Sequence, residues 1–135
     1  IVYREIVTPA SPQPAPANEP APAHRWHVDA NPVMLFRYSA LTFNGHRIHY
    51  DLPYSTNVEG HSGLLVHGPL QATLMLNLAC QIHGKQPKRM TYRGVSPLVC
   101  GEPIMVDADT ADTGGLACCV RAANGIVTMT AEVIL

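Results

Sequence analysis

The sequence predicts an α+β domain in which an antiparallel sheet curls around one long, buried helix. Residues 70–82 are apolar at nearly every position, which is typical of a helix enclosed by other structure. After Gly84 the hydrophobic period changes from that of a helix to the two-residue alternation of strands. A buried helix followed by a run of strands joined by short turns favours an α+β fold with antiparallel pairing.

The helix is expected to begin close to residue 68. Gly68 is a plausible N-cap, and Pro69 then takes the first helical position, where its missing N–H costs nothing. The few polar side chains recur every four residues and so share one seam of the helix: Thr73, Asn77 and Gln81.

The last third of the chain is predicted to be a β-meander. Apolar and polar residues alternate over 104–109, and a second strand is expected over 115–122. Asn124-Gly125 is a strong hairpin signal, and residues 127–135 place their apolar side chains at every second position. The turn between the first two strands is assigned to residues 112–115, which are rich in Gly, Asp and Thr.

The chain before the helix divides into three parts. Residues 1–8 are interpreted as the end of a preceding element or as a docking arm. Residues 9–24 are rich in Pro and Ala and hold no large apolar side chain, so an extended linker is expected. The folded domain is then expected to cover residues 25–135 and to include a buried strand at the apolar run 33–36.

The composition excludes several classes of function. The chain has 135 residues, which is enough for one domain, and its net charge of -1 comes without the basic stripe that a nucleic-acid surface requires. No apolar run approaches the roughly 20 residues of a membrane helix. With 47% hydrophobic and only 14% charged residues, part of the surface is expected to be covered by another domain or subunit.

The cysteines indicate a reducing compartment. The chain has 4 of them, at positions 80, 100, 118 and 119, and no pair has the two-residue gap of a zinc or thioredoxin-like site. Free thiols are therefore expected. Together with the lack of a signal peptide at the first residues, they predict a cytoplasmic protein, or a mitochondrial one if the source is eukaryotic.

Two stretches concentrate the polar residues that chemistry requires. Residues 39–51 read SALTFNGHRIHYD, and residues 63–76 read GLLVHGPLQATLML. Together these motifs resemble those of the MaoC-like hydratases and dehydratases, which have the hot-dog fold. Within that group the sequence is most similar to the branch containing hydroxyacyl-thioester dehydratase type 2 and the mesaconyl-C4-CoA (3-methylfumaryl-CoA) hydratases. The resemblance extends from about Trp26 to the end of the chain.

The resemblance implies a hydro-lyase in which water adds to a 2-enoyl-CoA or leaves a 3-hydroxyacyl thioester. CoA or an acyl carrier protein would carry the substrate, and no cofactor is implied. The wider group has a catalytic Asp followed five residues later by a His, and the matching positions here are Asn44 and His49. An amide cannot exchange a proton as a carboxylate does, but it can hold a water molecule. The position of the group's oxyanion donor is matched by Gly68.

Elementary chemistry gives a compatible account of the same residues. A histidine with a pKa near 6.5 can take a proton from water and return one, which suits His49 to act as base and acid. The free N–H groups at a helix N-terminus can receive negative charge, and because Pro69 has no N–H, Gly68 is the expected donor. Gly68 also allows close backbone approach. His46 and His49 form an HxxH pair that could bind a metal together with Asp51 or His61, but the sequence shows no convergent ligand geometry, so no metal site is predicted.

Four further residues are predicted to bind substrate. Arg47 precedes His49 by two residues and would share its face in an extended segment, where it could hold a terminal carboxylate; alternatively it reaches solvent or the CoA phosphates. Asp51 lies at the start of the loop that is expected to line the pocket. His67 is expected mainly to brace the loop before the helix, and Arg93 belongs to a basic cluster that either meets CoA or is simply solvated.

Two other functions stay open at this level. A hot-dog thioesterase needs the same pocket but directs water to the carbonyl carbon, and a non-catalytic hot-dog half would only support a partner domain. An uncovered sheet edge invites pairing, so the domain is predicted to form a homodimer or a pseudo-dimer with an upstream hot-dog half. No nucleic-acid or membrane partner is expected.

Overall fold

The computed structural model describes residues 19–135. Its centre is a five-stranded sheet in the order β1-β3-β4-β5-β2, with every neighbouring pair antiparallel. The predicted arm at residues 1–8 and the linker up to residue 18 lie outside the described residues. The strands are β1 (His24–Val28), β2 (Arg89–Gly94), β3 (Ile104–Thr110), β4 (Leu116–Arg121) and β5 (Val127–Ile134).

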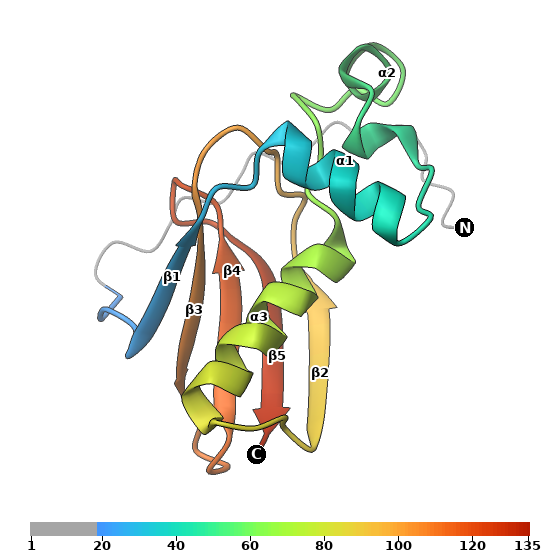
Figure 1. Ribbon diagram of the computed structural model, residues 1–135. Helices are drawn as coiled ribbons and strands as arrows, with labels where there is room; N and C mark the ends of the chain where they lie inside the picture. The colour runs from blue at the N-terminus through green and yellow to red at the C-terminus, as the bar shows by residue number, and fades with distance from the viewer. Residues whose placement is uncertain (1–18) are drawn as a thin grey trace.

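One long helix, α3 (Gly68–His83), lies diagonally across one face of this sheet (Figure 1). It contacts β2, β3, β4 and β5, so the prediction of a sheet built around one central helix is confirmed. The predicted polar seam of Thr73, Asn77 and Gln81 is the exposed side of the helix. Its opposite side is buried against the sheet: Leu70, Gln71, Ala72, Met75, Leu78 and Ala79.

The ends of α3 follow local chemistry. The first turn closes through the N–H of Gln71 and the carbonyl of His67, so His67, and not Gly68, is the N-cap residue. The helix ends at Gly84, whose φ of 75° is left-handed and favours glycine.

Within residues 19–135, no helix has the length and apolarity to cross a membrane.

The predicted meander is confirmed as β3, β4 and β5. Asn124 and Gly125 lie in the turn between β4 and β5, and Gly125 has a φ of 84°. At the preceding turn, a Cβ on Gly115 would lie 2.0 Å from the carbonyl oxygen of Val133, so only glycine fits there. Along β5 the predicted alternation holds, except that Thr128 is also buried, where its hydroxyl bonds the side chain of Gln71 at 2.8 Å.

The strand predicted at residues 33–36 is wrong, because these residues belong to helix α1 (Pro32–Leu41). Asn31 caps the helix through its side-chain oxygen, which accepts the Met34 N–H at 3.0 Å, and a proline in the first turn presets the helical φ. Leu35 is fully buried, whereas its neighbours on the other side of the helix are exposed. A four-residue apolar run cannot by itself distinguish a strand from such a helix.

Three short elements lie beyond the N-terminal end of α3, away from most of the sheet (Figure 1). They are α1, the 3₁₀ turn η1 (Arg47–His49) and α2 (Leu52–Asn57). Both predicted motifs meet here, since the loop that leads into α3 runs past η1 and the N–H of Leu65 bonds the carbonyl of Ile48 at 3.0 Å. The topology therefore gathers the polar residues at one end of the molecule.

The opposite face of the sheet carries a buried ionic cluster. The side chain of Asp107 is 4% exposed and bonds both Arg25 and Arg121. Arg121 also pairs with Glu19. The last part of the predicted linker is therefore attached to this face of the sheet.

Candidate active site

His49 ends η1 and is buried, with 7% of its surface exposed. Its Nδ1 lies 2.7 Å from the carbonyl oxygen of Leu65. Because a carbonyl only accepts hydrogen bonds, Nδ1 carries the proton of the neutral ring and Nε2 keeps its lone pair. Nε2 has no hydrogen-bond partner among residues 19–135 and is not sealed from solvent. His49 is thus a base whose free nitrogen is oriented by the backbone.

The surroundings of His49 keep it neutral near pH 7. Burial lowers its pKa below the usual 6.5, the hydrogen bond to Leu65 opposes this effect, and the nearby His46 adds to it. The ring is therefore available as a proton acceptor across the neutral range.

His67 lies directly against His49. The two imidazoles are stacked, with centroids 3.6 Å apart and planes inclined by 18°. The Nε2 of His67 is 2.8 Å from the Oγ of Ser39, and only 1% of its surface is exposed. Burial, with a smaller contribution from His49, lowers the pKa of His67 to about 4. These contacts with His49 and Ser39 are of the kind expected of a side chain that braces this region. The predicted role of His67 in substrate binding stays a prediction.

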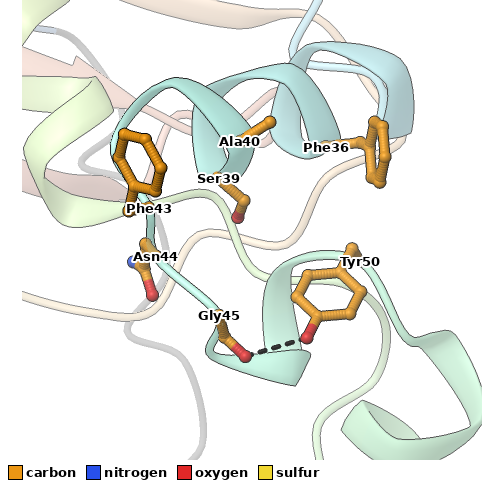
Figure 2. A pocket seen from close by; sticks show the side chains of 7 residues that line it. All are labelled: Phe36, Ser39, Ala40, Phe43, Asn44, Gly45 and Tyr50. Carbon is orange, nitrogen blue, oxygen red and sulfur yellow. Dashed lines mark hydrogen bonds between the residues drawn. The ribbon is translucent and has the colours of Figure 1, made fainter.

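A cavity of about 340 Å³ lies between α1 and the loop after it (Figure 2). Its walls are mostly apolar, and Ser39 and Asn44 supply the polar side chains that face it. Seven residues line the cavity: Phe36, Ser39, Ala40, Phe43, Asn44, Gly45 and Tyr50. His49 is not among them, but it is linked to the cavity through His67 and Ser39.

The loop after α1 fixes the side chain of Asn44. Its Oδ1 accepts the N–H of His46 at 3.0 Å, so the amide NH₂ is left as a donor beside the cavity. Phe43 just before it has a φ of 53°, which is rare for an aromatic residue, and its side chain is 97% exposed. This left-handed residue reverses the chain after α1 and thereby brings Asn44 to the cavity.

Arg47 does not take its predicted position, and it pairs with Asp51. Residues 47–49 form a 3₁₀ turn and not an extended segment, so the argument that Arg47 shares a face with His49 is wrong. The guanidinium of Arg47 instead bonds Asp51 at 2.8 and 3.0 Å and covers the ring of Tyr54 at 4.1 Å. Asp51 also caps α2 by accepting the N–H of Tyr54, so both of its oxygens have partners. These contacts favour a structural role for the pair.

Gly68 lies in the first turn of α3, one position inside the helix from the predicted N-cap. As the first residue of the helix it has an N–H with no carbonyl partner inside the helix. A Cβ added there would lie 3.5 Å from the Cε of Met129, an ordinary contact, so nothing in the described chain excludes a larger residue. The expected close approach of substrate to the Gly68 backbone stays a prediction. Arg93 lies exposed on the edge strand β2 and takes part in none of the contacts around His49.

Sequence reasoning missed two features of this site. Ser39 was part of the first motif, but nothing in its spacing from His67 showed that the two side chains bond. The stacking of His49 on His67 was also missed, because it depends on a loop that only the folded chain places beside η1. The presence of both histidines in the two motifs was the available signal.

The fold is that of MaoC-like dehydratases and (R)-hydratases. A MaoC-like dehydratase from Phytophthora capsici superposes with a TM-score of 0.72 at 17% identity, covering 93% of this chain and 46% of that one. The (R)-hydratase from A. caviae involved in PHA biosynthesis superposes with a TM-score of 0.69 at 17% identity, covering 82% and 89% of the two chains. The prediction of a hot-dog fold is thereby confirmed.

The chain belongs to the hydroxyacyl-thioester dehydratase type 2 family, whose profile matches residues 1–100. It is 47% identical over 102 residues to a mesaconyl-C(4)-CoA hydratase from Chloroflexus aurantiacus, covering 73% of this chain and 35% of the relative. It is 38% identical over 88 residues to the mitochondrial hydroxyacyl-thioester dehydratase type 2 of Schizosaccharomyces pombe, covering 63% and 29%. The chain thus spans about a third of the length of these relatives.

Proposed function

We propose that this chain carries the catalytic residues of a hydro-lyase that hydrates 2-enoyl thioesters and dehydrates 3-hydroxyacyl thioesters. The proposal rests on the hydrogen bonding and burial of His49. Its Nδ1 is bonded to the Leu65 carbonyl, its Nε2 has no hydrogen-bond partner among residues 19–135, and burial lowers its pKa. Membership in a family of hydroxyacyl-thioester dehydratases supports the same chemistry.

The reaction needs one group that moves a proton in both directions. In hydration, Nε2 of His49 accepts a proton from water while the water oxygen bonds C3 of the enoyl group. The electron pair of the double bond moves toward the thioester oxygen, and protonated His49 then returns the proton to C2. Dehydration is the reverse. Such acid–base catalysis contributes about 10²–10⁴-fold to the rate.

Two further groups complete the proposed mechanism. The N–H of Gly68, at the positive end of α3, stabilises the negative charge that develops on the thioester oxygen. The free amide NH₂ of Asn44 donates to the oxygen of the reacting water and so orients its lone pair. No step requires a cofactor, and the thioester of CoA or of an acyl carrier protein is the substrate.

The cavity beside Asn44 is the proposed acyl site. It is a shallow, open pocket with a volume of about 340 Å³. Its apolar walls, which include Phe36, Phe43 and Tyr50, suit hydrocarbon. None of the described residues that line it is cationic. We therefore favour an uncharged acyl group over one with a second carboxylate.

We also propose that the domain works paired with a second hot-dog domain, either another copy or a domain of the same polypeptide. Strand β2 is an edge strand with β5 as its only neighbour in the described sheet. On the side of α1 away from the sheet, Val33 and Leu41 are 58 and 80% exposed in the described chain. Apolar surface and an open strand edge are stabilised by a partner. The length of the curated relatives leaves room for such a domain.

We also propose a cellular location for the protein. The free cysteines favour a reducing compartment, and we place the protein in the cytoplasm, or in the mitochondrion if its source is eukaryotic.

A thioesterase would use the same fold, and one experiment separates the two activities. The chain is incubated with crotonyl-CoA and with acetyl-CoA while the enoyl absorbance and free thiol are followed. The proposal predicts loss of enoyl absorbance from crotonyl-CoA without thiol release from either ester. Thiol release from either ester, matching any fall in enoyl-thioester absorbance, would replace the hydratase by a thioesterase, because hydrolysis also removes that absorbance.

A further inference from the structure

Ser39 lies on α1, outside the residues to which the proposed mechanism gives a role, yet it connects two parts of the site. It is buried, with 6% of its surface exposed, and it lines the cavity while its Oγ lies 2.8 Å from the Nε2 of His67. Figure 2 shows its hydroxyl pointing toward the space between Asn44 and Tyr50. One small side chain therefore contacts both the acyl cavity and the imidazole on which His49 stacks.

The ring of His67 is held on several sides. His49 covers one face at 3.6 Å, Tyr38 meets the ring edge to face at 4.9 Å, and Ser39 bonds Nε2. The remaining nitrogen, Nδ1, is buried and has no hydrogen-bond partner among the described residues. Ser39 is therefore the only hydrogen-bond partner of the His67 ring among the described residues, and replacing it would leave the ring without one.

The hydrogen bond between Ser39 and His67 admits two arrangements. If the serine hydroxyl donates to Nε2, Nδ1 must carry the ring proton and a buried N–H is left without an acceptor. If Nε2–H donates to Oγ, Nδ1 is left with only a lone pair, and the serine O–H is free to donate into the cavity. Orphaned buried N–H groups are rarer in proteins than under-used acceptors, which favours the second arrangement.

We propose that Ser39 is a positioning residue for His49: its Oγ accepts the Nε2–H of His67 and so fixes the tautomer and ring plane of the imidazole that supports the base. This inference rests on the proposed function for its effect on rate, but the tautomer itself is independent of activity. The hydroxyl hydrogen of Ser39 then faces the acyl cavity as a donor.

The tautomer is measured in the wild-type chain by a long-range proton–nitrogen correlation spectrum of the imidazoles. The signals of His67 are identified as those that disappear in His67→Phe. The proposal predicts the Nε2–H tautomer in wild type and a mixture of tautomers in Ser39→Ala. An Nδ1–H tautomer in wild type, or an unchanged tautomer in Ser39→Ala, would overturn it. A matched control is Ser55→Ala, which removes a fully buried hydroxyl bonded to the Gly63 carbonyl and is expected to leave the His67 tautomer unchanged.

The effect on rate is tested with a double-mutant cycle on crotonyl-CoA. Ser39→Ala is expected to lower kcat about tenfold and to change KM less than about twofold, and in the His67→Phe background it should have almost no further effect. If Ser39→Ala lowered kcat by the same factor in the wild-type and His67→Phe backgrounds, Ser39 would not act through His67. A wild-type chain without any hydratase activity would count against the proposed function, while the spectrum would still decide the tautomer.

Discussion

The imidazoles of His49 and His67 lie face to face, with centroids 3.6 Å apart. Two cationic rings at this distance repel each other, so the pair carries at most one positive charge at moderate pH. His67 is the more deeply buried ring, and its pKa of about 4 leaves the proton to His49. The stack therefore provides one working base on a neutral support.

The low pKa of His67 predicts a loss of stability in mild acid. In the unfolded chain its pKa is near 6.5, so between pH 6.5 and about 4 the unfolded state binds a proton that the folded state does not. The free energy of unfolding therefore has its full value above pH 6.5. It decreases by on the order of 3 kcal/mol as the pH falls toward 4. Urea unfolding at several pH values measures this. A His67→Phe variant should show a flatter profile, and an equal slope in both proteins would contradict the assignment.

Asn44 is expected to matter less than His49. Asn44→Ala removes the donor to water and should lower kcat by about 10-fold to 100-fold, since a lost hydrogen bond to a reacting group costs about 1.5–3 kcal/mol. Asn44→Asp keeps the acceptor for the His46 N–H and introduces the carboxylate found in the wider group of enzymes, so its rate should exceed that of Asn44→Ala. Steady-state kinetics of the three proteins gives the comparison. Equal rates for Asn44→Ala and wild type would remove this residue from the mechanism.

The role of the Gly68 N–H is tested by a pair of substitutions. Gly68→Pro removes the N–H at a helix position that tolerates proline, and Gly68→Ala keeps it while adding the same Cβ beside Met129. Loss of an oxyanion donor costs about 10²–10³-fold in kcat, so the proline variant should be slower than the alanine variant by that factor. Circular dichroism checks that both are folded. Similar rates for the two variants would place the oxyanion donor elsewhere.

The pairing of Arg47 with Asp51 makes a prediction about substrate choice. Because two of its guanidinium nitrogens are bonded to Asp51, Arg47→Leu should change the rates with crotonyl-CoA and mesaconyl-C4-CoA by similar factors, within about threefold. Kinetics with both esters and with octenoyl-CoA, in wild type and variant, measures the ratio. A selective loss with mesaconyl-C4-CoA would show that Arg47 binds a second carboxylate after all.

Much of the fold follows from the sequence because its signals are local. The change in hydrophobic period after Gly84, the polar seam of α3 and the Asn124-Gly125 turn each depend on residues close together in the chain, and each prediction is confirmed. The apolar run at residues 33–36 is too short to carry a period. Its helical state is set by the cap at Asn31, which sequence reasoning overlooked.

The site could be predicted only in part, for a related reason. The two motifs contain His49, Asn44 and Gly68, whereas the contacts that give His49 its character come from Leu65, His67 and Ser39. Hydrogen bonds and stacking across 16 to 28 residues of sequence depend on how the loop before α3 folds against η1. No spacing rule supplies that geometry.

The proton-transfer role of His49 is tested most directly by comparing wild type with His49→Gln on crotonyl-CoA. Glutamine can still donate to the Leu65 carbonyl but cannot exchange a proton, so the fold should be kept while kcat falls by about 10²–10⁴-fold. Enoyl absorbance gives the rate, and thermal unfolding checks the fold. A folded His49→Gln variant that retains more than about a tenth of the wild-type kcat would show that His49 is not the base.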